Sequence, residues 1–126
     1  MTDPVFEITK AAAFDAAHRL PAGGPEGSAN TRLHGHSFRV EATVRGAAKP
    51  PVGWVDDLGQ LDLALKAIAG DLDHGLLNDI PGLESPTLEA LCLHFAQRLK
   101  PDFPGLCRIA VSRPSIGERC ALELPV

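Results

Sequence analysis

Two histidines lie two residues apart in the stretch TRLHGHSFRV, which spans residues 31–40. Side chains at positions i and i+2 of a β-strand project from the same side, about 6 to 7 Å apart along the chain, so the imidazoles of His34 and His36 could bind one ion. Three neutral imidazoles suit zinc and leave its fourth tetrahedral position for water or substrate, as in a catalytic site. The pair therefore indicates a zinc site if a third ligand comes from another part of the chain.

The residues around the two histidines alternate as in a strand with one covered face. From Gly35 to Arg45 the odd positions are mainly polar, whereas the even positions from His34 to Val44 carry His, His, Phe, Val, Ala and Val. Two imidazoles buried on that face without partners would each cost roughly 1 to 3 kcal/mol, and a bound metal removes this cost. A chance pair, or a hydrogen-bonded pair at the surface, is the alternative that the spacing alone leaves open.

An earlier strand can supply the third imidazole. Four upstream hydrophobic residues share the parity of His18, so this strand would deliver His18 to the same face as the other two histidines. These residues are Phe6, Ile8, Phe14 and Ala16. A β-bulge around residues 11–13 would shift the register and remove this arrangement. The sequence PAGGPEGSANT between the two strands has the composition of a loop.

Two amphipathic helices are predicted downstream of these strands. Apolar residues recur at helical spacing over residues 58–72, and Asp57 with Gln60 forms a capping-box pattern at the start. Ser85 as N-cap, with Pro86 at the first helical position, opens a second helix whose apolar stripe ends before the next proline.

Two short strands complete the predicted fold, at residues 107–113 and 119–124, on either side of the turn-like sequence PSIG. The element order is therefore ββααββ. This order predicts an α+β fold in which two helices cover one face of a four-stranded antiparallel sheet.

The composition is that of one globular domain covering residues 1–126, with 44% hydrophobic and 22% charged residues. No apolar run approaches the roughly 20 residues of a membrane span, and the start MTDPVFEITK does not read as a secretory signal, so we expect a cytoplasmic protein. The net charge of -4 argues against a nucleic-acid partner but is compatible with a small anionic ligand. Cys92, Cys107 and Cys120 show no CxxC spacing and are expected to be buried thiols.

Four segments, FDAAHRL, RLHGHSF, GWVDDLGQL and LDHGLLNDIPGLESPTLEAL, together resemble the 6-pyruvoyltetrahydropterin synthase family, which includes the bacterial 6-carboxytetrahydropterin synthases of queuosine biosynthesis. The resemblance covers nearly the whole chain in order. It implies the tunnelling fold, in which subunits join their sheets into a barrel, usually as a hexamer of two trimers. It also implies that His18, His34 and His36 hold zinc.

The resemblance further implies that Asp73 and His74 form an acid/base relay. In such a relay the carboxylate fixes the tautomer of the imidazole and raises its basicity, so that the ring can move protons near neutral pH. On spacing alone, a capped turn after the first helix is the alternative.

Two positions depart from the family pattern. The family's cysteine lies four residues before the first histidine of HGH, where this chain has Asn30, and an amide has no titratable proton. The family's glutamate, which binds the amino-imino edge of the pterin ring, is replaced by Arg113, and strand parity points this guanidinium inward. Glu118 could supply the missing carboxylate if the loop folds back, and Arg113 suits a carboxylate or phosphate.

The sequence therefore predicts a zinc-dependent lyase that acts on 7,8-dihydroneopterin triphosphate or a related pterin. Two alternatives stay open. One is a diverged paralogue that uses zinc on another small anionic substrate held by Arg113, and the other is a catalytically silent oligomer that binds zinc or pterin.

Overall fold

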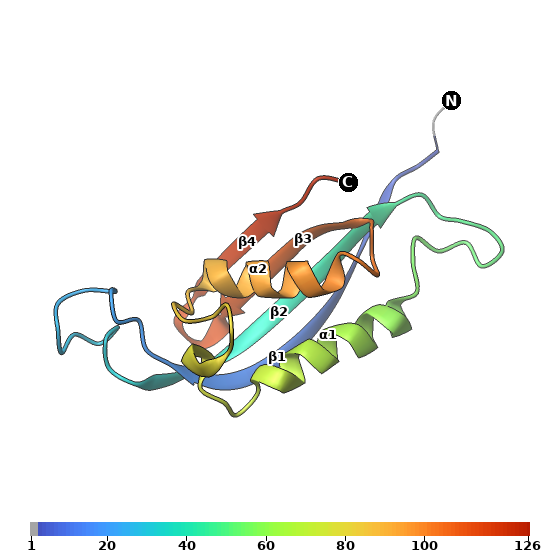
Figure 1. The fold of residues 1–126 in the computed structure, drawn as a ribbon. Coiled ribbons are helices and arrows are strands. Elements are labelled where there is room, and N and C mark those ends of the chain that lie inside the picture. Colours follow the sequence, from blue (N-terminus) through green and yellow to red (C-terminus); the bar gives the residue numbers. More distant parts are fainter. Residues whose placement is uncertain (1–2) are drawn as a thin grey trace.

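A computed structural model describes residues 3–126 as a single four-stranded sheet with both helices on one face (Figure 1). Neighbouring strands are antiparallel, and their order in the sheet follows their order in the chain. The strands are β1 (Phe6–His18), β2 (His34–Gly46), β3 (Leu106–Arg113) and β4 (Glu118–Glu123). The helices are α1 (Leu58–Leu72) and α2 (Leu88–Leu99), and two short 3-10 segments are η1 (Leu77–Asp79) and η2 (Pro114–Ile116). The predicted ββααββ order and fold class are confirmed.

The pairing of β1 with β2 determines which residues face the core. It runs without a shift from Phe6 opposite Gly46 to His18 opposite His34, so no bulge interrupts the first strand. The even-numbered positions on the two strands therefore share one face. The Phe14 and Phe38 rings stack on that face with their centroids 5.0 Å apart.

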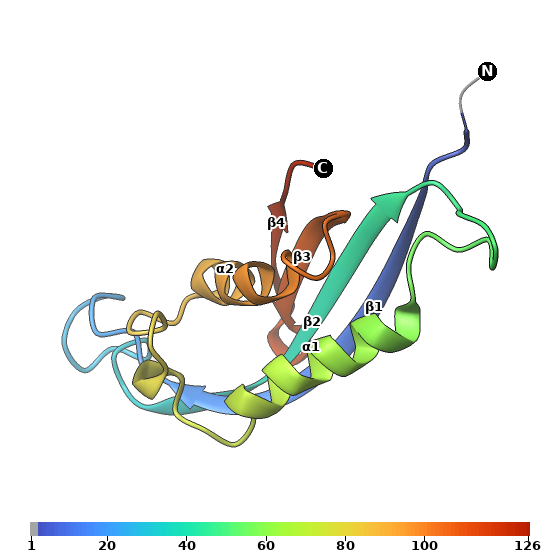
Figure 2. The same ribbon diagram turned by 45° about the vertical axis from the view of Figure 1, so that its right-hand side comes forward.

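The helices cover this face of the sheet. Figure 2 shows α1 lying along β1, and α2 lying along β3 and β4. Their inward residues are buried and form one core with the sheet, as the apolar spacing predicts. For α1 these are Leu61, Leu65, Ile68 and Leu72, and for α2 they are Leu88, Leu91, Cys92, Phe95 and Leu99.

The start of α1 agrees with the predicted Asp57 cap, although the Asp57 amide donates to Oδ1 of Asp56 at 2.8 Å rather than to Gln60, so the capping box is only half formed, and the start of α2 differs from the prediction. The Asp57 side chain accepts from two amides in the first turn of α1. In α2 the N-cap is Thr87, two residues after the predicted Ser85, and its hydroxyl accepts from the Ala90 amide at 3.1 Å. Pro86 lies before the helix, since the first intrahelical bond runs from the Leu91 amide to the Thr87 carbonyl at 3.0 Å, whereas the Pro86 carbonyl accepts from the buried His18 ring at 3.1 Å.

The cysteines and the single tryptophan differ in burial. Cys92 and Cys107 are buried free thiols, as predicted, and Cys120 is partly buried. Trp54, just before the start of α1, is 46% exposed and is therefore not a core residue.

Among residues 3–126, neither helix has the length and apolar character that a membrane span requires.

The two candidate caps of α2 give a direct stability test. Thr87→Ala should lower the free energy of unfolding by about 1 kcal/mol, because the Ala90 amide loses its acceptor. The matched variant Ser85→Ala removes an exposed hydroxyl and should change stability by less than about 0.5 kcal/mol. Urea denaturation measures both values. Equal losses in the two variants would contradict this assignment of the cap.

Candidate active site

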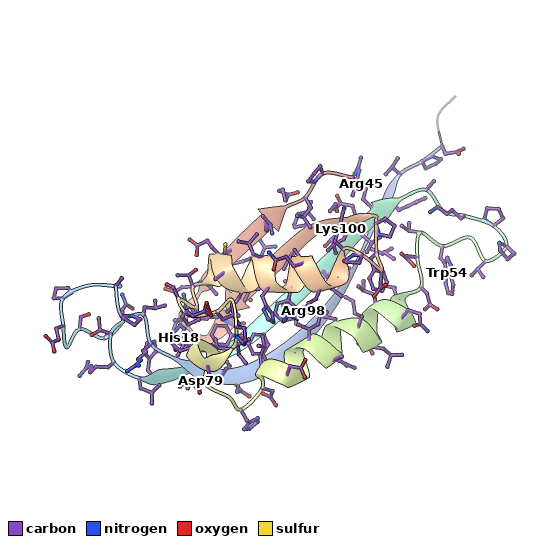
Figure 3. All side chains as sticks on the ribbon, in the orientation of Figure 1. His18, Arg45, Trp54, Asp79, Arg98 and Lys100 are labelled. Atoms are coloured by element: carbon purple, nitrogen blue, oxygen red, sulfur yellow. The ribbon has the colours of Figure 1, made fainter. Side chains whose placement is uncertain are left out.

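The three predicted metal ligands come together at one end of the sheet. His18 closes β1 and His34 opens β2 directly opposite it, while His36 follows on the same face. Their candidate ligand nitrogens all lie within 4.8 Å of one another. Figure 3 shows His18 at the end of the molecule away from Arg45 and Trp54. The sheet register therefore produces the cluster that the alternation pattern predicts.

Backbone carbonyls fix the tautomers of two of these rings. Nδ1 of His18 donates to the Pro86 carbonyl at 3.1 Å, and Nδ1 of His34 donates to the Arg32 carbonyl at 2.7 Å. A carbonyl oxygen only accepts, so each neutral ring carries its proton on Nδ1 and an unshared pair on Nε2. The two Nε2 atoms are 3.0 Å apart. Two unshared pairs at this distance repel each other, whereas a cation bound between them would be attracted to both.

Burial favours the neutral form of two of these imidazoles, those of His18 and His36. His18 is fully buried, and burial lowers its pKa to about 4 despite the hydrogen bond to Pro86. Burial also lowers the pKa of His36, and the nearby Arg113 guanidinium adds to this effect. Neutral imidazole is the form that binds a metal ion, so burial favours the metal-binding form of His18 and His36.

A cavity of about 590 Å³ adjoins two of the histidines. Its wall includes His34, His36, Asn30, Arg113 and Glu118. The structure thus brings all three predicted substrate-binding residues to the candidate metal site.

The two charged residues of this cavity form an ion pair across neighbouring strands. Arg113 on β3 lies opposite Glu118 on β4, with Nε and Oε1 2.8 Å apart. The Nε–H bond does not point at that oxygen, so the contact is an ion pair rather than a hydrogen bond. The Arg113 side chain is only 14% exposed, which agrees with the predicted inward direction. Glu118 therefore lies beside the position where Arg113 replaces the family's glutamate.

Asn30 contacts its own loop. Its side-chain amide donates to the Gly23 carbonyl at 3.1 Å, within the segment that joins β1 to β2. This amide helps to hold the loop and offers no ionisable group to the cavity.

Asp73 and His74 follow α1 and attach to the outer edge of β1. The Asp15 amide donates to Oδ1 of Asp73 at 2.9 Å, and the His74 amide donates to the Asp15 carbonyl at 2.6 Å. His74 adopts a positive φ of 58°, a conformation that is uncommon for a residue other than glycine. The backbone of β1 therefore determines where this turn lies.

The Asp73 carboxylate also orients the His74 ring, because Nδ1 of His74 lies 2.8 Å from its Oδ2. The Asp15 amide and then His74 lower the pKa of Asp73, and the hydrogen bond to Asp73 raises the pKa of His74. The ring thus donates from Nδ1 and keeps Nε2 as its basic atom. Asp73 is at the same time the C-cap of α1, so the capped turn and the predicted pair are both present.

His74 lies in the wall of a second, more open cavity of about 750 Å³. This cavity shares His36 and Ile116 with the first one. No hydrogen bond or ion pair among residues 3–126 joins His74 to the three histidines. His74 and the histidine cluster therefore line neighbouring cavities of one chain.

Two polar residues of the second cavity were missed by sequence reasoning. Asp15 and Ser37 lie opposite each other on β1 and β2, and the Ser37 hydroxyl donates to Oδ1 of Asp15 at 2.5 Å. Their odd parity places them on the sheet face away from the histidines. That parity, combined with their position next to the histidine segments, is the signal that could have identified them.

Known proteins resemble this chain over nearly its full length. Residues 7–123 match the family 6-pyruvoyl tetrahydropterin synthase. The chain is 40% identical over 110 residues to 6-carboxy-5,6,7,8-tetrahydropterin synthase of Synechocystis sp., covering 82% of this chain and 83% of that protein. It is 35% identical over 94 residues to dihydroneopterin monophosphate aldolase of Pyrococcus furiosus, covering 75% of each.

Solved structures show the same fold. The 6-pyruvoyl tetrahydropterin synthase of Caenorhabditis elegans superposes with a TM-score of 0.85 at 21% identity, covering 99% of each chain. That of Plasmodium vivax gives a TM-score of 0.74 at 16% identity, covering 98% of this chain and 100% of the other. The predicted tunnelling fold is thereby confirmed. From the match over residues 7–123 and the identity to full-length relatives, the chain belongs to the 6-pyruvoyl tetrahydropterin synthase family.

Proposed function

We propose that this protein is a zinc-dependent lyase that acts on 7,8-dihydroneopterin triphosphate or a related pterin, like the 6-pyruvoyl and 6-carboxytetrahydropterin synthases. The observation that carries the proposal is the pair of unprotonated Nε2 atoms 3.0 Å apart, beside a cavity with charged walls. The relatives named as tetrahydropterin synthase and dihydroneopterin monophosphate aldolase support a pterin substrate.

His18, His34 and His36 would hold the zinc ion. The donor set fits, because three neutral imidazole nitrogens suit zinc and the carbonyls of Pro86 and Arg32 orient two of the rings. When bound, zinc supplies Lewis acidity that polarises hydroxyl and carbonyl oxygens of the substrate side chain.

Asp73 and His74 would transfer protons. Nε2 of His74 is the free basic atom of the ring, since Nδ1 is held by the Asp73 carboxylate. The Asp15 amide in turn holds this carboxylate, so the pair has a fixed direction before substrate binds.

Arg113, Glu118 and Asn30 would contact the substrate. The carboxylate of Glu118 can accept from the amino-imino edge of a pterin ring, and the guanidinium of Arg113 can donate to a carbonyl or an anionic group. Asn30 takes the place of the family cysteine and cannot act as a thiolate base.

A second candidate activity is carbon–carbon cleavage of a phosphorylated pterin or another small anionic substrate, without the thiol-dependent steps. Asn30 and Arg113 favour it, and a dihydroneopterin monophosphate aldolase is among the relatives. A zinc-binding or pterin-binding oligomer without turnover is the third possibility, and the oriented Asp73 and His74 pair argues against it.

A homo-oligomer, most simply a hexamer, is part of the proposal. Among the described residues, no backbone–backbone hydrogen bond from outside the sheet reaches residues 118–123 of β4 or residues 7–13 of β1, the two edge strands. Exposed strand edges pair readily with another chain. A cytoplasmic location stays a prediction from the sequence.

Zinc content tests the ligand set. Wild-type protein loaded with zinc and then desalted should retain about one ion per subunit, and His34→Ala/His36→Ala should lose it because one imidazole cannot hold the metal. His94→Gln is the matched control, since it removes a buried histidine of α2 that lies outside the cluster. Metal analysis that finds undiminished zinc in the double variant would contradict the assignment.

Product analysis tests the reaction. Zinc-loaded protein incubated with 7,8-dihydroneopterin triphosphate should give weak or no synthase product, with Asn30→Cys partly restoring it, because loss of a general base typically costs about 10²- to 10⁴-fold. Mass spectrometry separates the synthase product from an aldolase product with a shortened side chain. Full synthase activity in the wild type that Asn30→Cys leaves unchanged would show that another group is the base.

The pH dependence tests Asp73 and His74. Because the carboxylate raises the pKa of His74, the ring becomes a base only as the pH rises through that raised pKa. Asp73→Asn should therefore lower turnover and move the acid limb of kcat/KM to lower pH, and His74→Ala should nearly abolish turnover. An acid limb at the same pH in wild type and Asp73→Asn would exclude His74 as the titrating base.

Light scattering tests the assembly. The open edges of β1 and β4 should pair between subunits, giving a particle several times the chain mass of 13.3 kDa. A monomer at micromolar concentration would contradict the proposed oligomer.

A further inference from the structure

A further cavity of about 390 Å³ lies in the loop between β1 and β2. Its wall includes Arg19, Glu26, Thr31 and Arg32. Arg32 also lines the cavity that contains His34 and His36, so the two cavities adjoin at this residue. In Figure 1 the loop extends beyond the end of the sheet where the histidines lie. The cavity is therefore an outward continuation of the candidate active site.

The guanidinium groups of Arg19 and Arg32 have no hydrogen-bond or ion-pair partner among residues 3–126. Other arginines do pair with carboxylates, including Arg108 with Glu123 at 2.6 Å. A guanidinium that pairs with no carboxylate keeps all of its donors for a ligand. The wall of this cavity therefore carries two unpaired guanidinium groups and one carboxylate, Glu26, although the chain has a net charge of -4.

The backbone at both arginines is nevertheless held in place. The Arg19 amide donates to Oδ1 of Asn78 at 3.0 Å, and Nδ2 of Asn78 donates back to the Arg19 carbonyl at 2.8 Å. The Arg32 carbonyl accepts from Nδ1 of His34 at 2.7 Å. The backbone from which each arginine side chain projects is therefore held by hydrogen bonds. At Arg32 the backbone carbonyl bonds directly to a candidate metal ligand, His34.

Three arginines line the two cavities in order of distance from the histidines. Arg113 lines only the inner cavity, Arg32 lines both cavities, and Arg19 lines only the outer one. A planar guanidinium binds phosphate oxygens through two parallel hydrogen bonds, and a row of them matches a linear chain of phosphates.

We infer that Arg32 and Arg19 form a binding subsite for the phosphate chain of the substrate. This inference rests on the proposed function, because it takes the pterin ring to lie at Arg113 and Glu118 with its side chain passing the histidines. Arg32 then meets the phosphate nearest the pterin, and Arg19 meets the more distant ones. Glu26 shares the outer cavity and opposes the binding of an anion.

The experiment compares dissociation constants of dihydroneopterin, its monophosphate and its triphosphate, measured by pterin fluorescence. Zinc-loaded protein carries His74→Ala in every case, so that turnover does not disturb the equilibrium. The triphosphate should bind about 100-fold more tightly than dihydroneopterin, from roughly tenfold at each arginine. Arg32→Gln should weaken binding of both phosphorylated ligands about tenfold, and Arg19→Gln should weaken mainly the triphosphate.

Three further variants test the opposing charge, the shape of the guanidinium and a distant control position. Glu26→Gln should tighten triphosphate binding, since it removes the opposing charge. Arg32→Lys should keep part of the effect, because it retains the charge without the planar fork. Arg45→Gln removes an equal charge at the far end of β2 (Figure 3) and should leave all three constants unchanged.

Binding of the three ligands distinguishes failure of the phosphate subsite from failure of the proposed function. If all three bind equally well, or if Arg45→Gln weakens the triphosphate as much as Arg19→Gln and Arg32→Gln do, the phosphate subsite is wrong while pterin binding stands. If none of them binds, the proposed function and the subsite both fail.

Discussion

The unbroken antiparallel pairing of β1 with β2 is the constraint on which the rest of the site depends. It aligns Phe14 with Phe38 in the core and, four residues further along β1, His18 with His34. A shift of one residue in either strand would turn the affected side chains to the opposite face of the sheet. The same register that builds the core therefore also brings the histidines together.

The histidine cluster also forms a hydrogen bond with the segment that leads into α2. The Pro86 carbonyl, just before α2, accepts from His18, and Thr87 then caps the helix. Since a proline has no amide hydrogen, its carbonyl is its only backbone hydrogen-bonding group, and here that group orients a candidate metal ligand. The packing of α2 on the sheet thus contributes to the tautomer of a ring that belongs to β1.

The free edge of β1 positions Asp73 and His74 in a similar way. Asp15 holds Asp73 and His74 through its amide and carbonyl, while Ala17 and Arg19 bond to the residues that follow. This coverage protects the end of an edge strand and at the same time fixes a carboxylate and an imidazole in a strained turn. Elsewhere the edge stays open, which leaves room for pairing with another subunit.

The sequence by itself determined the elements and the face on which each histidine lies. Period-2 alternation and helical spacing are local properties of the chain, so the ββααββ order, the cap at Asp57 and the convergence of His18, His34 and His36 could all be predicted from it. The family motifs added Asp73 and His74. Tertiary structure decided what depends on contacts between distant segments. The cap of α2 is Thr87 rather than Ser85, with the Pro86 carbonyl bonded to the His18 ring of a distant strand, and Arg113 pairs with Glu118 across β3 and β4. Tertiary structure also placed Asp15 beside Ser37 and joined Arg32 to two cavities, since neither strand register nor loop path is encoded in the spacing of any one segment.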